Sequence, residues 1–365
     1  MDPYEQLGVS RVINASGMMT ALGGSTISAA TGAAMAAAGQ QQVVIDDLQR
    51  RAGADIARLL GTEDAMVTTG AAAGIALMVA ALVAGSDLSR VEALPDPGDA
   101  PHEIIIQAGH VVNFGAPVRQ MVALGGGKAR PIGSANQVHE AHLTGAINST
   151  TAGVLYVQSH HCVQKGMLSL ERVIALSHAA NVPVILDAAA EEDLRHFANC
   201  GVDLVTFSGG KAIGGPASGI IAGRADLIDA CRAQLAGIGR PMKIGKEGII
   251  GLITALHAYL NRDLPALRAH QSALVDELLS AFNAIPGVRT QRLEDEAGRG
   301  IERAAIELSP ERALDLARFL RAGTPAIYPR GHLLNLGLVA FDPRPLSPDD
   351  VQKIVNRVKA FFEGE

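Results

Sequence analysis

Short runs of hydrophobic residues alternate with longer stretches of helical spacing through the middle of this chain. Between about residues 46 and 245 the alternation repeats many times, which is typical of a mostly parallel sheet covered by helices on both faces. We predict strands at 66–69, 103–107, 119–124, 154–158, 183–187, 204–207 and 219–223. The pattern therefore predicts an α/β fold with a large domain over residues 46–245.

The pattern of apolar positions changes on either side of this region. Residues 1–45 form an expected N-terminal arm that is rich in Gly, Ser and Thr and runs into an alanine-rich helix. Residues 246–365 predict a smaller C-terminal α+β domain. Its expected helices are 246–260, 264–284 and 347–362, and its expected strands lie near 288–292, 303–307 and 334–341. We expect the charged stretch 293–303 to be an exposed hairpin or loop.

Lys211 lies in a sequence context that can make a lysine reactive. It follows the apolar strand 204–207 through Ser-Gly-Gly, and Asp187 ends the strand before that one. A solvated lysine has a pKa of about 10.4 and is a poor nucleophile, but desolvation at a glycine-walled strand end lowers that pKa. Both residues come at the carboxyl ends of strands, where open α/β sheets bind ligands.

The pairing of these two residues points to one cofactor. A lysine that carries pyridoxal 5'-phosphate (PLP) and a carboxylate that keeps the pyridine nitrogen protonated are the minimum that this cofactor requires. Taken alone, Lys211 reads as a solvated loop lysine and Asp187 as the N-cap of the following helix. Their order within one sheet favours a PLP site in which both residues are catalytic.

Residues 66–74, Met-Val-Thr-Thr-Gly-Ala-Ala-Ala-Gly, predict a place for the phosphate of the cofactor. A short strand turns into a long helix of small residues, so the backbone N–H groups of Gly70, Ala71 and Ala72 stand at the positive end of a helix dipole. Small side chains let an anion approach, and Thr69 adds a hydroxyl. The alternative is a closely packed helix without a ligand, since no Gly-x-Gly-x-x-Gly or Walker pattern is present.

Composition narrows the range of functions. The chain has 365 residues, 48% of them hydrophobic, with 40 glycines and a net charge of −6. No run of Lys or Arg exceeds two residues and a negative chain repels nucleic acid, so we expect no nucleic-acid partner. We find no signal peptide and no membrane span, and expect a cytoplasmic protein. The three cysteines fit no metal-ligand spacing, so we expect reduced thiols and no metal.

Several segments together closely resemble the bacterial selenocysteine synthase (L-seryl-tRNA selenium transferase) family, a branch of the fold-type I PLP-dependent enzymes. The resemblance is carried by the runs 12–17, 69–74, 133–136, 186–187 and 201–216. It covers nearly the whole chain. It implies the fold-type I PLP-dependent transferase fold, PLP as the cofactor, and Lys211, Asp187 and Ser208 among the residues that bind it.

Within that family, the segments 158–167, 325–330 and 342–346 look like the shorter subgroup of D-glucosaminate-6-phosphate ammonia-lyase-like proteins. Two departures separate the chain from true selenocysteine synthases. The core motif already starts at Val12, which leaves no room for their tRNA-binding domain, and Gly209-Gly210 precede the lysine where Gly-Asp is common. We therefore carry over the cofactor residues and not the tRNA substrate.

The resemblance also implies residues beside the pyridine ring. Fold-type I enzymes usually stack a flat side chain on this ring, and His110 is the expected residue, with Phe114 as a competitor. A solvent-exposed loop histidine is the plain alternative for His110. His160 and His161 sit at the end of the strand 154–158, and neighbouring strand residues point to opposite faces. We expect one of the two to face the cofactor and the other to pack.

Substrate contacts are expected from positively charged side chains. In this fold class the C-terminal domain typically supplies a guanidinium that clamps the substrate carboxylate, and Arg330, shortly after Tyr328, is the first choice, with Arg344 as the second. A surface ion pair is the alternative for either arginine. Arg240 and Lys243 lie in the one compact basic stretch and are candidates for a substrate phosphate or carboxylate, or else for a charged loop before a helix.

These roles predict a lyase that removes water and ammonia from an amino acid to give a 2-oxo acid. The resemblance to the subgroup implies the substrate class, a hydroxylated amino acid such as D-glucosaminate or its 6-phosphate. Lys211 is the expected base at the substrate Cα, and His160, His161 or Tyr328 the expected proton donor to the leaving hydroxyl. A β-replacement transferase, an amino-acid racemase and a non-enzymatic PLP-binding protein are the alternatives.

The resemblance implies an assembly as well. Fold-type I sites are completed across a two-fold interface, so a homodimer or a higher homo-oligomer is expected. The arm 14–26 and the basic stretch 240–246 have no evident role inside one subunit. We expect the arm beside the cofactor of the partner, where Ser16, Thr20 or Ser25 contacts substrate or phosphate.

Overall fold

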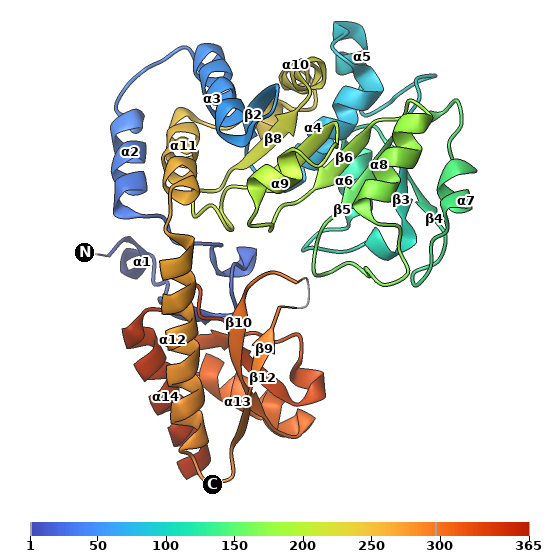
Figure 1. Cartoon of the computed structure of the whole chain (residues 1–365). Coiled ribbons are helices and arrows are strands. Elements are labelled where there is room, and N and C mark those ends of the chain that lie inside the picture. Colours follow the sequence, from blue (N-terminus) through green and yellow to red (C-terminus); the bar gives the residue numbers. More distant parts are fainter. Residues whose placement is uncertain (1, 296–297, 365) are drawn as a thin grey trace. The chain divides into compact units, whose positions relative to one another are not determined.

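A computed structural model gives the structure of residues 2–295 and 298–364 and divides the chain into two compact units (Figure 1). The first unit is Ile27–Leu260. The second joins the N-terminal residues through Thr26 to the residues from Asn261 onward. One unit is thus continuous in sequence, and the other is built from both ends of the chain.

The expected boundaries at 45/46 and 245/246 both fall inside the first unit. The helix α2 (Ala29–Gly39) packs against α11 (Lys246–Leu260), so closely that a Cβ on Gly251 would lie 2.6 Å from Cγ of Met35. Residues 27–45 and 246–260, which lie outside the expected boundaries, are therefore part of this unit.

A mostly parallel sheet forms the centre of the first unit, which confirms the predicted α/β class. Its seven strands run in the order β2-β8-β7-β6-β5-β3-β4. They are β2 (Asp64–Thr68), β3 (Glu103–Gln107), β4 (Lys128–Ile132), β5 (Thr151–Val157), β6 (Val184–Asp187), β7 (Leu204–Ser208) and β8 (Gly219–Gly223). The strand β8 is antiparallel to both of its neighbours, and the other pairs are parallel.

Helices cover both faces of this sheet (Figure 1). Alternate strand residues divide between two cores, as Ile185 packs with α4 on one face and Leu186 with α3 on the other. The helix α4 is buried almost all round, which explains its continuous run of apolar residues. One face carries α4 (Ala71–Ala84), α5 (Leu88–Ala93), α6 (Val118–Leu124) and α10 (Ala225–Ala233), and the other α3 (Ile45–Leu60), α8 (Leu170–Ala179), α9 (Leu194–Ala198) and α11.

The second unit is an α+β structure with its own core. Its antiparallel strands are ordered β12-β10-β9, and β1 (Val12–Ala15) pairs in parallel with β11 (Ala326–Pro329) in the described part of the chain. The antiparallel strands are β9 (Arg289–Glu294), β10 (Glu302–Glu307) and β12 (Leu338–Phe341), and the helices are α1 (Pro3–Gln6), α12 (Leu264–Asn283), α13 (Pro310–Arg321) and α14 (Pro348–Glu363). Leu278, Phe282 and Phe341 are fully buried in this core.

Short elements complete the description. They are α7 (Glu140–Thr144) and the 3-10 turns η1 (Thr20–Leu22), η2 (Ala108–His110), η3 (Gln234–Ala236), η4 (Arg240–Met242) and η5 (Leu334–Leu336).

The prediction of a strand at 119–124 is wrong, because this segment belongs to the helix α6. Val118 and Val122 are buried four residues apart while Arg119 is exposed, which is helical spacing. The strand lies just beyond it, at β4. This edge strand, Lys-Ala-Arg-Pro-Ile, contains two charged residues and Pro131, which an edge position tolerates, so it carries little apolar signal.

Sequence expectations for the second unit are corrected in several places. The expected arm contains the strand β1, and the expected strand 334–341 is confined to 338–341, after a turn closed by Gly337 at φ 79°. The helix α13 and the strand β11 were not expected. The charged stretch 293–303 does join two paired strands, but Asp295 and Arg303 are buried rather than exposed, and residues 296–297 of that stretch lie outside the described residues.

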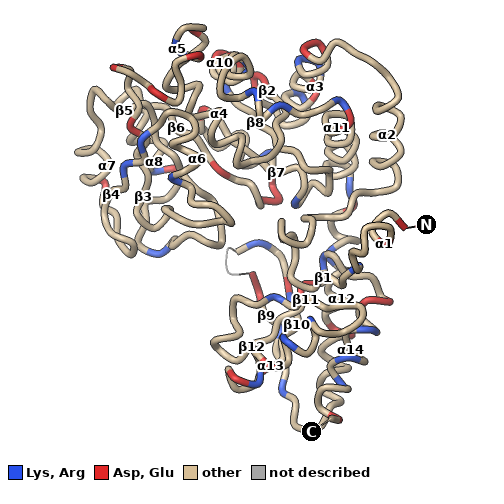
Figure 2. Tube along the Cα trace, turned by 180° about the vertical axis from the view of Figure 1, so that it is seen from behind, with Lys and Arg blue, Asp and Glu red and all other residues tan. Residues whose placement is uncertain are grey.

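Charged residues of both signs are interspersed over each unit (Figure 2). On α3, Arg50 and Arg51 pair with Asp46 and Asp47 one helical turn away. Within residues 2–295 and 298–364, no helix combines the length and the apolar character needed to cross a membrane.

Candidate active site

The carboxyl ends of β6 and β7 bring Asp187 and the lysine loop to one edge of the sheet. Asp187 is the last residue of β6 and pairs in register with Thr206 of β7. The backbone of Ala189 links the two strand ends, since its N–H donates to Oδ1 of Asp187 at 3.1 Å and its carbonyl accepts from the N–H of Ser208 at 3.2 Å. Lys211 follows Ser208 in a turn, and its charge acts on Asp187.

The electrostatic state of Asp187 suits a cationic ligand. Burial raises the pKa of this carboxyl to about 6, against the opposing effects of the Ala189 N–H and the Lys211 charge. Among the residues that the structure describes, the Ala189 N–H is the one hydrogen-bond donor to this carboxylate. A buried carboxylate with so few partners gains from a cation beside it, and a protonated pyridine nitrogen fits that need.

The N-terminus of α4 reaches the same edge across β8. Thr68 pairs with Gly219, and Gly219 pairs with Ser208, so these three residues form one row across the sheet. A Cβ on Gly219 would lie 2.5 Å from the carbonyl carbon of Gly70, so only glycine lets the turn before α4 rest on β8.

Free backbone donors stand at this helix end. The first helical hydrogen bond runs from the N–H of Gly74 to the carbonyl of Gly70 at 2.9 Å, so the N–H groups of Ala71, Ala72 and Ala73 precede it and point out of the helix. The expected free N–H of Gly70 is instead donated to the hydroxyl of Thr68 at 3.2 Å. Thr69 is exposed, and the space above Gly70 is open, since a Cβ built there meets nothing within 4 Å. The geometry fits a phosphate group.

The turn that carries Lys211 is compact and depends on glycine. A Cβ on Gly209 would lie 2.0 Å from Oγ of Ser218, and the N–H of Gly215 donates to the carbonyl of Gly209 at 2.8 Å. The carbonyl of Lys211 accepts from the N–H of Gly214 at 3.1 Å. This folded turn fixes the backbone from which the lysine side chain departs.

His110 is completely buried beside the end of β5. Its Nδ1 accepts from the N–H of Val157 at 3.3 Å, and its ring meets that of Tyr156 edge-on, with 4.5 Å between centroids. Burial lowers the pKa of His110 to about 4, so the ring is neutral, and its Nε2 has no partner among residues 2–295 and 298–364. The alternative of an exposed loop histidine is therefore wrong. Phe114 is half-buried nearby in sequence, and which ring stacks on the cofactor stays a prediction.

His160 and His161 lie beyond β5 rather than on it. The strand ends at Val157, and the two imidazole rings sit together in the following turn with 4.0 Å between centroids. The expectation that they point to opposite faces of a strand does not hold, because strand geometry has ended before them. His160 is half-buried and His161 is exposed.

Cys162 is a neighbour of Asp187 that the sequence analysis missed. Its N–H donates to the carbonyl of Ser159 at 3.1 Å in the turn after β5. Burial, and then the nearby charge of Asp187, raises the pKa of the thiol to about 12, so it stays neutral. Its position directly after His160 and His161 is the sequence signal that could have identified it. Examining the cysteines only for metal-ligand spacing does not detect this signal.

The basic stretch 240–246 contains two kinds of residue. Lys246 pairs with Glu247 and donates to the carbonyl of Gly39 at 3.2 Å. Arg240 and Lys243 are exposed, and neither side chain forms a hydrogen bond or ion pair within the described part of the chain, although the backbone N–H of Arg240 donates to the carbonyl of Gly237 at 3.0 Å. The structure does not link Arg240 or Lys243 to the edge that holds Asp187.

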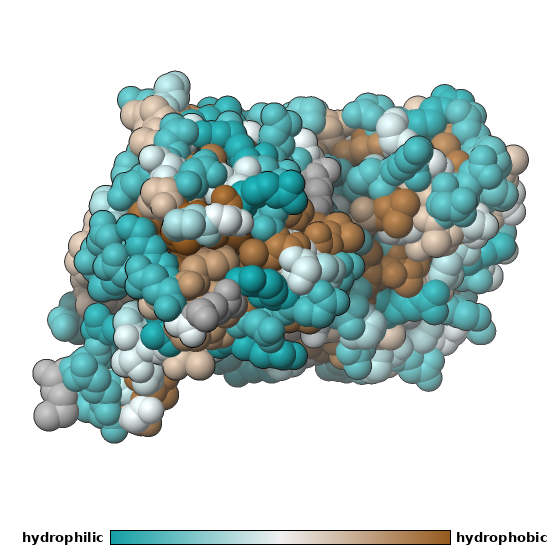
Figure 3. Space-filling view, turned by 90° about the horizontal axis from the view of Figure 1, so that it is seen from below, coloured by the Kyte–Doolittle hydropathy of each residue, from teal (hydrophilic) through white to brown (hydrophobic). Residues whose placement is uncertain are grey.

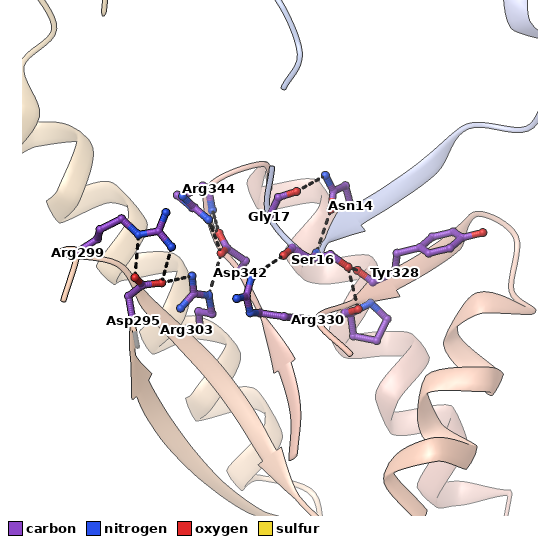
Figure 4. Close-up of polar contacts among 11 residues, drawn as sticks. Asn14, Ser16, Gly17, Asp295, Arg299, Arg303, Tyr328, Arg330, Asp342 and Arg344 are labelled. Atoms are coloured by element: carbon purple, nitrogen blue, oxygen red, sulfur yellow. Dashed lines mark hydrogen bonds and ion pairs between the residues drawn. The ribbon is translucent and has the colours of Figure 1, made fainter. Parts of the chain in front are cut away.

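Arg330 belongs to the second unit, where it follows β11 (Figure 4). Its backbone N–H donates to the carbonyl of Ala340 at 2.8 Å, and Nη1 reaches the carbonyl of Ser16 at 3.5 Å. The buried Nε has no partner, and no carboxylate pairs with this guanidinium, among the residues described. Burial and the charge of Arg303 lower the pKa of Arg330. A surface ion pair is thus not its role in this structure.

Ser16 forms hydrogen bonds with the backbone just before Arg330. The hydroxyl of Ser16 lies 2.9 Å from the carbonyl of Tyr328 and 2.8 Å from that of Pro329, and it donates to them. The ring of Tyr328 points away from Arg330 (Figure 4) and lies 5.7 Å from the guanidinium of Arg321. Because the Ser16 hydroxyl is engaged inside its own unit, the expectation that it contacts a partner's ligand loses its support.

The second unit also contains a hollow of about 580 Å³. It is lined by α12 and by the ends of β9 and β10, with Arg268 and Arg299 among the lining residues. None of the expected site residues lines it.

Comparison with known proteins gives one family. A model of the family SelA, L-seryl-tRNA selenium transferase, matches residues 12–309. The chain is 42% identical over 362 residues to a 5'-C-glycyluridine monooxygenase-decarboxylase of a Streptomyces species, which covers 98% of this chain and 91% of that one. It is also 42% identical over 364 residues to a D-glucosaminate-6-phosphate ammonia lyase of Salmonella typhimurium, with coverage of 99% and 98%.

A solved structure agrees with these relatives. The structure of a D-glucosaminate-6-phosphate ammonia-lyase superposes with a TM-score of 0.92 at 40% identity, covering 100% of this chain and 99% of that one. The architecture is that of the fold-type I PLP-dependent enzymes, as the sequence implied.

Proposed function

Because the chain belongs to the L-seryl-tRNA selenium transferase family, we propose that it is a PLP-dependent ammonia-lyase acting on an amino-sugar acid such as D-glucosaminate 6-phosphate. The observation that carries the proposal is the full-length likeness to D-glucosaminate-6-phosphate ammonia-lyase, at a TM-score of 0.92. The buried carboxylate beside the lysine loop supports the same chemistry from within this chain.

PLP is the cofactor, and the residues of the first unit fit it. When bound, PLP draws electrons from the Cα of an amino acid and so makes the Cα proton acidic. Asp187 holds the positive charge of the ring nitrogen, and the N–H groups of Ala71 and Ala72, with the Thr69 hydroxyl, hold the phosphate. Lys211 would hold the cofactor through Nζ, and the same atom, once released from the cofactor, would move the Cα proton.

The second unit supplies the group that recognises the substrate carboxylate in this proposal. Arg330 offers a half-buried guanidinium with an unpartnered Nε, which suits bidentate binding of a carboxylate. Arg240 and Lys243 are assigned to the substrate phosphate, because both are exposed cations without ion pairs among the described residues. The hydroxyl at Cβ would leave as water with a proton from His160 or His161, and a water molecule would replace the nitrogen at Cα, so that the net reaction gives a 3-deoxy-2-oxo acid and ammonia.

A second function has equal support from sequence identity. The Streptomyces relative, also 42% identical, is a monooxygenase-decarboxylase, so oxidative decarboxylation of an amino acid is the competing reaction. The two reactions differ in the gases that they consume and release. Ammonia elimination needs no oxygen, whereas oxidative decarboxylation consumes oxygen and releases carbon dioxide.

One experiment separates the two functions. The PLP-loaded protein is given D-glucosaminate 6-phosphate in air and under nitrogen, and ammonia, 2-oxo acid and oxygen uptake are measured, with the K211A variant as the blank. We expect ammonia and 2-oxo acid in equal amounts at the same rate in both atmospheres. Oxygen uptake without 2-oxo acid would overturn the proposal in favour of the monooxygenase.

We also propose that the protein works as a homodimer or higher homo-oligomer in the cytoplasm. Large apolar side chains of the second unit stand in solvent, among them Tyr4 (58% exposed), Leu7 (78%) and Met19 (46%). Hydrophobic residues also reach the surface in the face shown in Figure 3. Sedimentation of the holoenzyme at micromolar concentration tests this, and a fully active monomer would contradict it.

A further inference from the structure

The two carboxylates whose charges act on Arg330, those of Asp342 and Asp295, form hydrogen bonds with other arginines. Asp342 is fully buried, and its Oδ1 accepts from Nε of Arg344 at 2.9 Å. Its Oδ2 accepts from Nη2 of Arg344 and from Nε of Arg303, each at 2.9 Å. Both oxygens of Asp342 are therefore occupied by two guanidinium groups.

Asp295 is occupied in the same way. Arg299 donates to it from Nε at 2.8 Å and from Nη2 at 3.1 Å, and Arg303 donates from Nη2 at 2.9 Å. Burial works to raise the pKa of Asp295, but these hydrogen bonds and charges outweigh it and hold the pKa well below its usual range. We call these residues the arginine cluster (Figure 4). It consists of Asp295, Arg299, Arg303, Arg330, Asp342 and Arg344.

Among the residues that the structure describes, the arginine cluster holds more positive than negative charge. Four arginines face two aspartates there, and the shared carboxylates leave Arg330 as the arginine without one among these residues. Asp342 nevertheless lies near enough for its charge to stabilise the charged form of Arg330. Figure 4 shows the Arg330 guanidinium on the side of Asp342, with no interaction drawn between them.

The N-terminal segment packs closely against the ion pair between Asp342 and Arg344. Gly17 has φ 98°, and a Cβ on it would lie 3.0 Å both from Nη2 of Arg344 and from Oδ2 of Asp342. Asn14 holds this turn by donating from Nδ2 to the carbonyl of Gly17 at 2.8 Å. A glycine and a local hydrogen bond thus keep the backbone against the pair.

We propose that Arg344 is a positioning residue that occupies Asp342 and so keeps the Arg330 guanidinium available for the substrate carboxylate. The proposal rests on the role given to Arg330 in the proposed function. Without Arg344, Asp342 regains two free acceptor sites beside a cation that has no carboxylate. The pair that then forms between Asp342 and Arg330 competes with the substrate.

The expected effect is on binding and not on the chemical step. If Asp342 captures Arg330 in about nine molecules out of ten, the apparent Kd and KM rise about tenfold, while kcat at saturation is unchanged. The variant R344Q should show this split. R344K, which keeps a charge and one donor for Asp342, should stay close to the wild type. R318Q, which removes an exposed arginine paired with Asp315 in the same unit, is the matched control for a lost charge.

A double-mutant cycle distinguishes capture from direct contact. KM for D-glucosaminate 6-phosphate and Kd for D-gluconate 6-phosphate, which lacks the amine, are measured for R344Q with and without D342N. Capture predicts that R344Q weakens binding when Asp342 is present and has no effect in the D342N background. An equal loss in both backgrounds would mean that Arg344 acts by contact or by charge alone, and would overturn the proposal.

A second cycle covers the case in which D342N does not fold, since this change leaves Arg303 short of a partner. In the R330A background, capture predicts that R344Q causes no further loss of D-gluconate 6-phosphate binding, and a further tenfold loss would refute it. The same series tests the premise separately. If R330A itself leaves Kd and KM unchanged, the role of Arg330 fails; if R330A weakens binding and R344Q does not, only the role of Arg344 fails.

Discussion

Replacing Asp187 by asparagine separates its catalytic role from its effect on stability. The substitution keeps the shape of the side chain and removes its charge at the end of β6. We expect the rate of ammonia release to fall about a thousandfold, which is about 4 kcal/mol of transition-state stabilisation, because the amide cannot hold the positive charge of the cofactor ring. In the cofactor-free protein we expect the opposite sign, a gain in stability.

The size of that gain follows from the buried carboxyl. Burial raises the pKa of Asp187 from its ordinary value of 3.8 to about 6. The folded state therefore binds more protons than the unfolded state between pH 4 and pH 6, and stability falls as the pH rises through this window. Above it the full cost, about 3 kcal/mol, is present. D187N lacks this cost, so without cofactor it should exceed the wild type in stability by up to about 3 kcal/mol at pH 7 and match it near pH 3.

Urea unfolding of cofactor-free protein at several pH values, together with kcat of the loaded enzyme, measures both effects. Asp203 is the matched control, since it is also 6% exposed but lies at the other end of the sheet strands. Burial works to raise its pKa, yet the Val184 N–H, Arg224 and His178 outweigh this and hold the pKa below its usual value. D203N should therefore destabilise at pH 7. If D187N destabilises the cofactor-free protein as D203N does, or keeps kcat within tenfold of wild type, the reasoning is refuted.

Three further changes test the site. K211A should lose the visible absorption band of lysine-bound PLP together with activity, and an unaltered band in its spectrum would contradict the assignment of Lys211. G219A should raise the Kd for PLP at least tenfold, on the order of 1.4 kcal/mol, because the added Cβ lies 2.5 Å from the backbone of Gly70, whereas G39A, whose Cβ meets only the flexible Glu247 at 3.6 Å, should bind PLP normally. R330K should raise KM for the amino-sugar acid about tenfold or more with little change in kcat, since a lysine cannot form a bidentate pair; an unchanged KM would remove Arg330 from the substrate site.

The part of the site that the sequence predicts is the part built from strand ends. Asp187 and Lys211 each follow a recognisable apolar run, and parallel strands bring their carboxyl ends to one edge, so topology alone places them together. The same logic fails for His160 and His161, because the strand stops at Val157 and no pattern marks that end.

The arginine cluster shows a second limit of sequence reasoning. Arg303 and Asp342 are 39 residues apart and look like ordinary surface charges, and only the packing of β10 against β12 buries them together. The segment of helix α6 predicts a strand because its short apolar run fits both periods, and the neighbouring strand β4, which contains two charged residues and a proline, has a weaker apolar pattern.

The parallel pairing of β1 with β11 has a consequence for the order in which the protein is made. The Ser16 hydroxyl and the Tyr328 carbonyl that it meets are 312 residues apart, so β1 leaves the ribosome long before the strand β11 with which it pairs. The unit Ile27–Leu260 is continuous and emerges whole in the meantime, and its folding shortens the loop that β1 must close. The lysine, the carboxylate and the phosphate-binding turn thus take shape in the nascent chain before Arg330 has been synthesised.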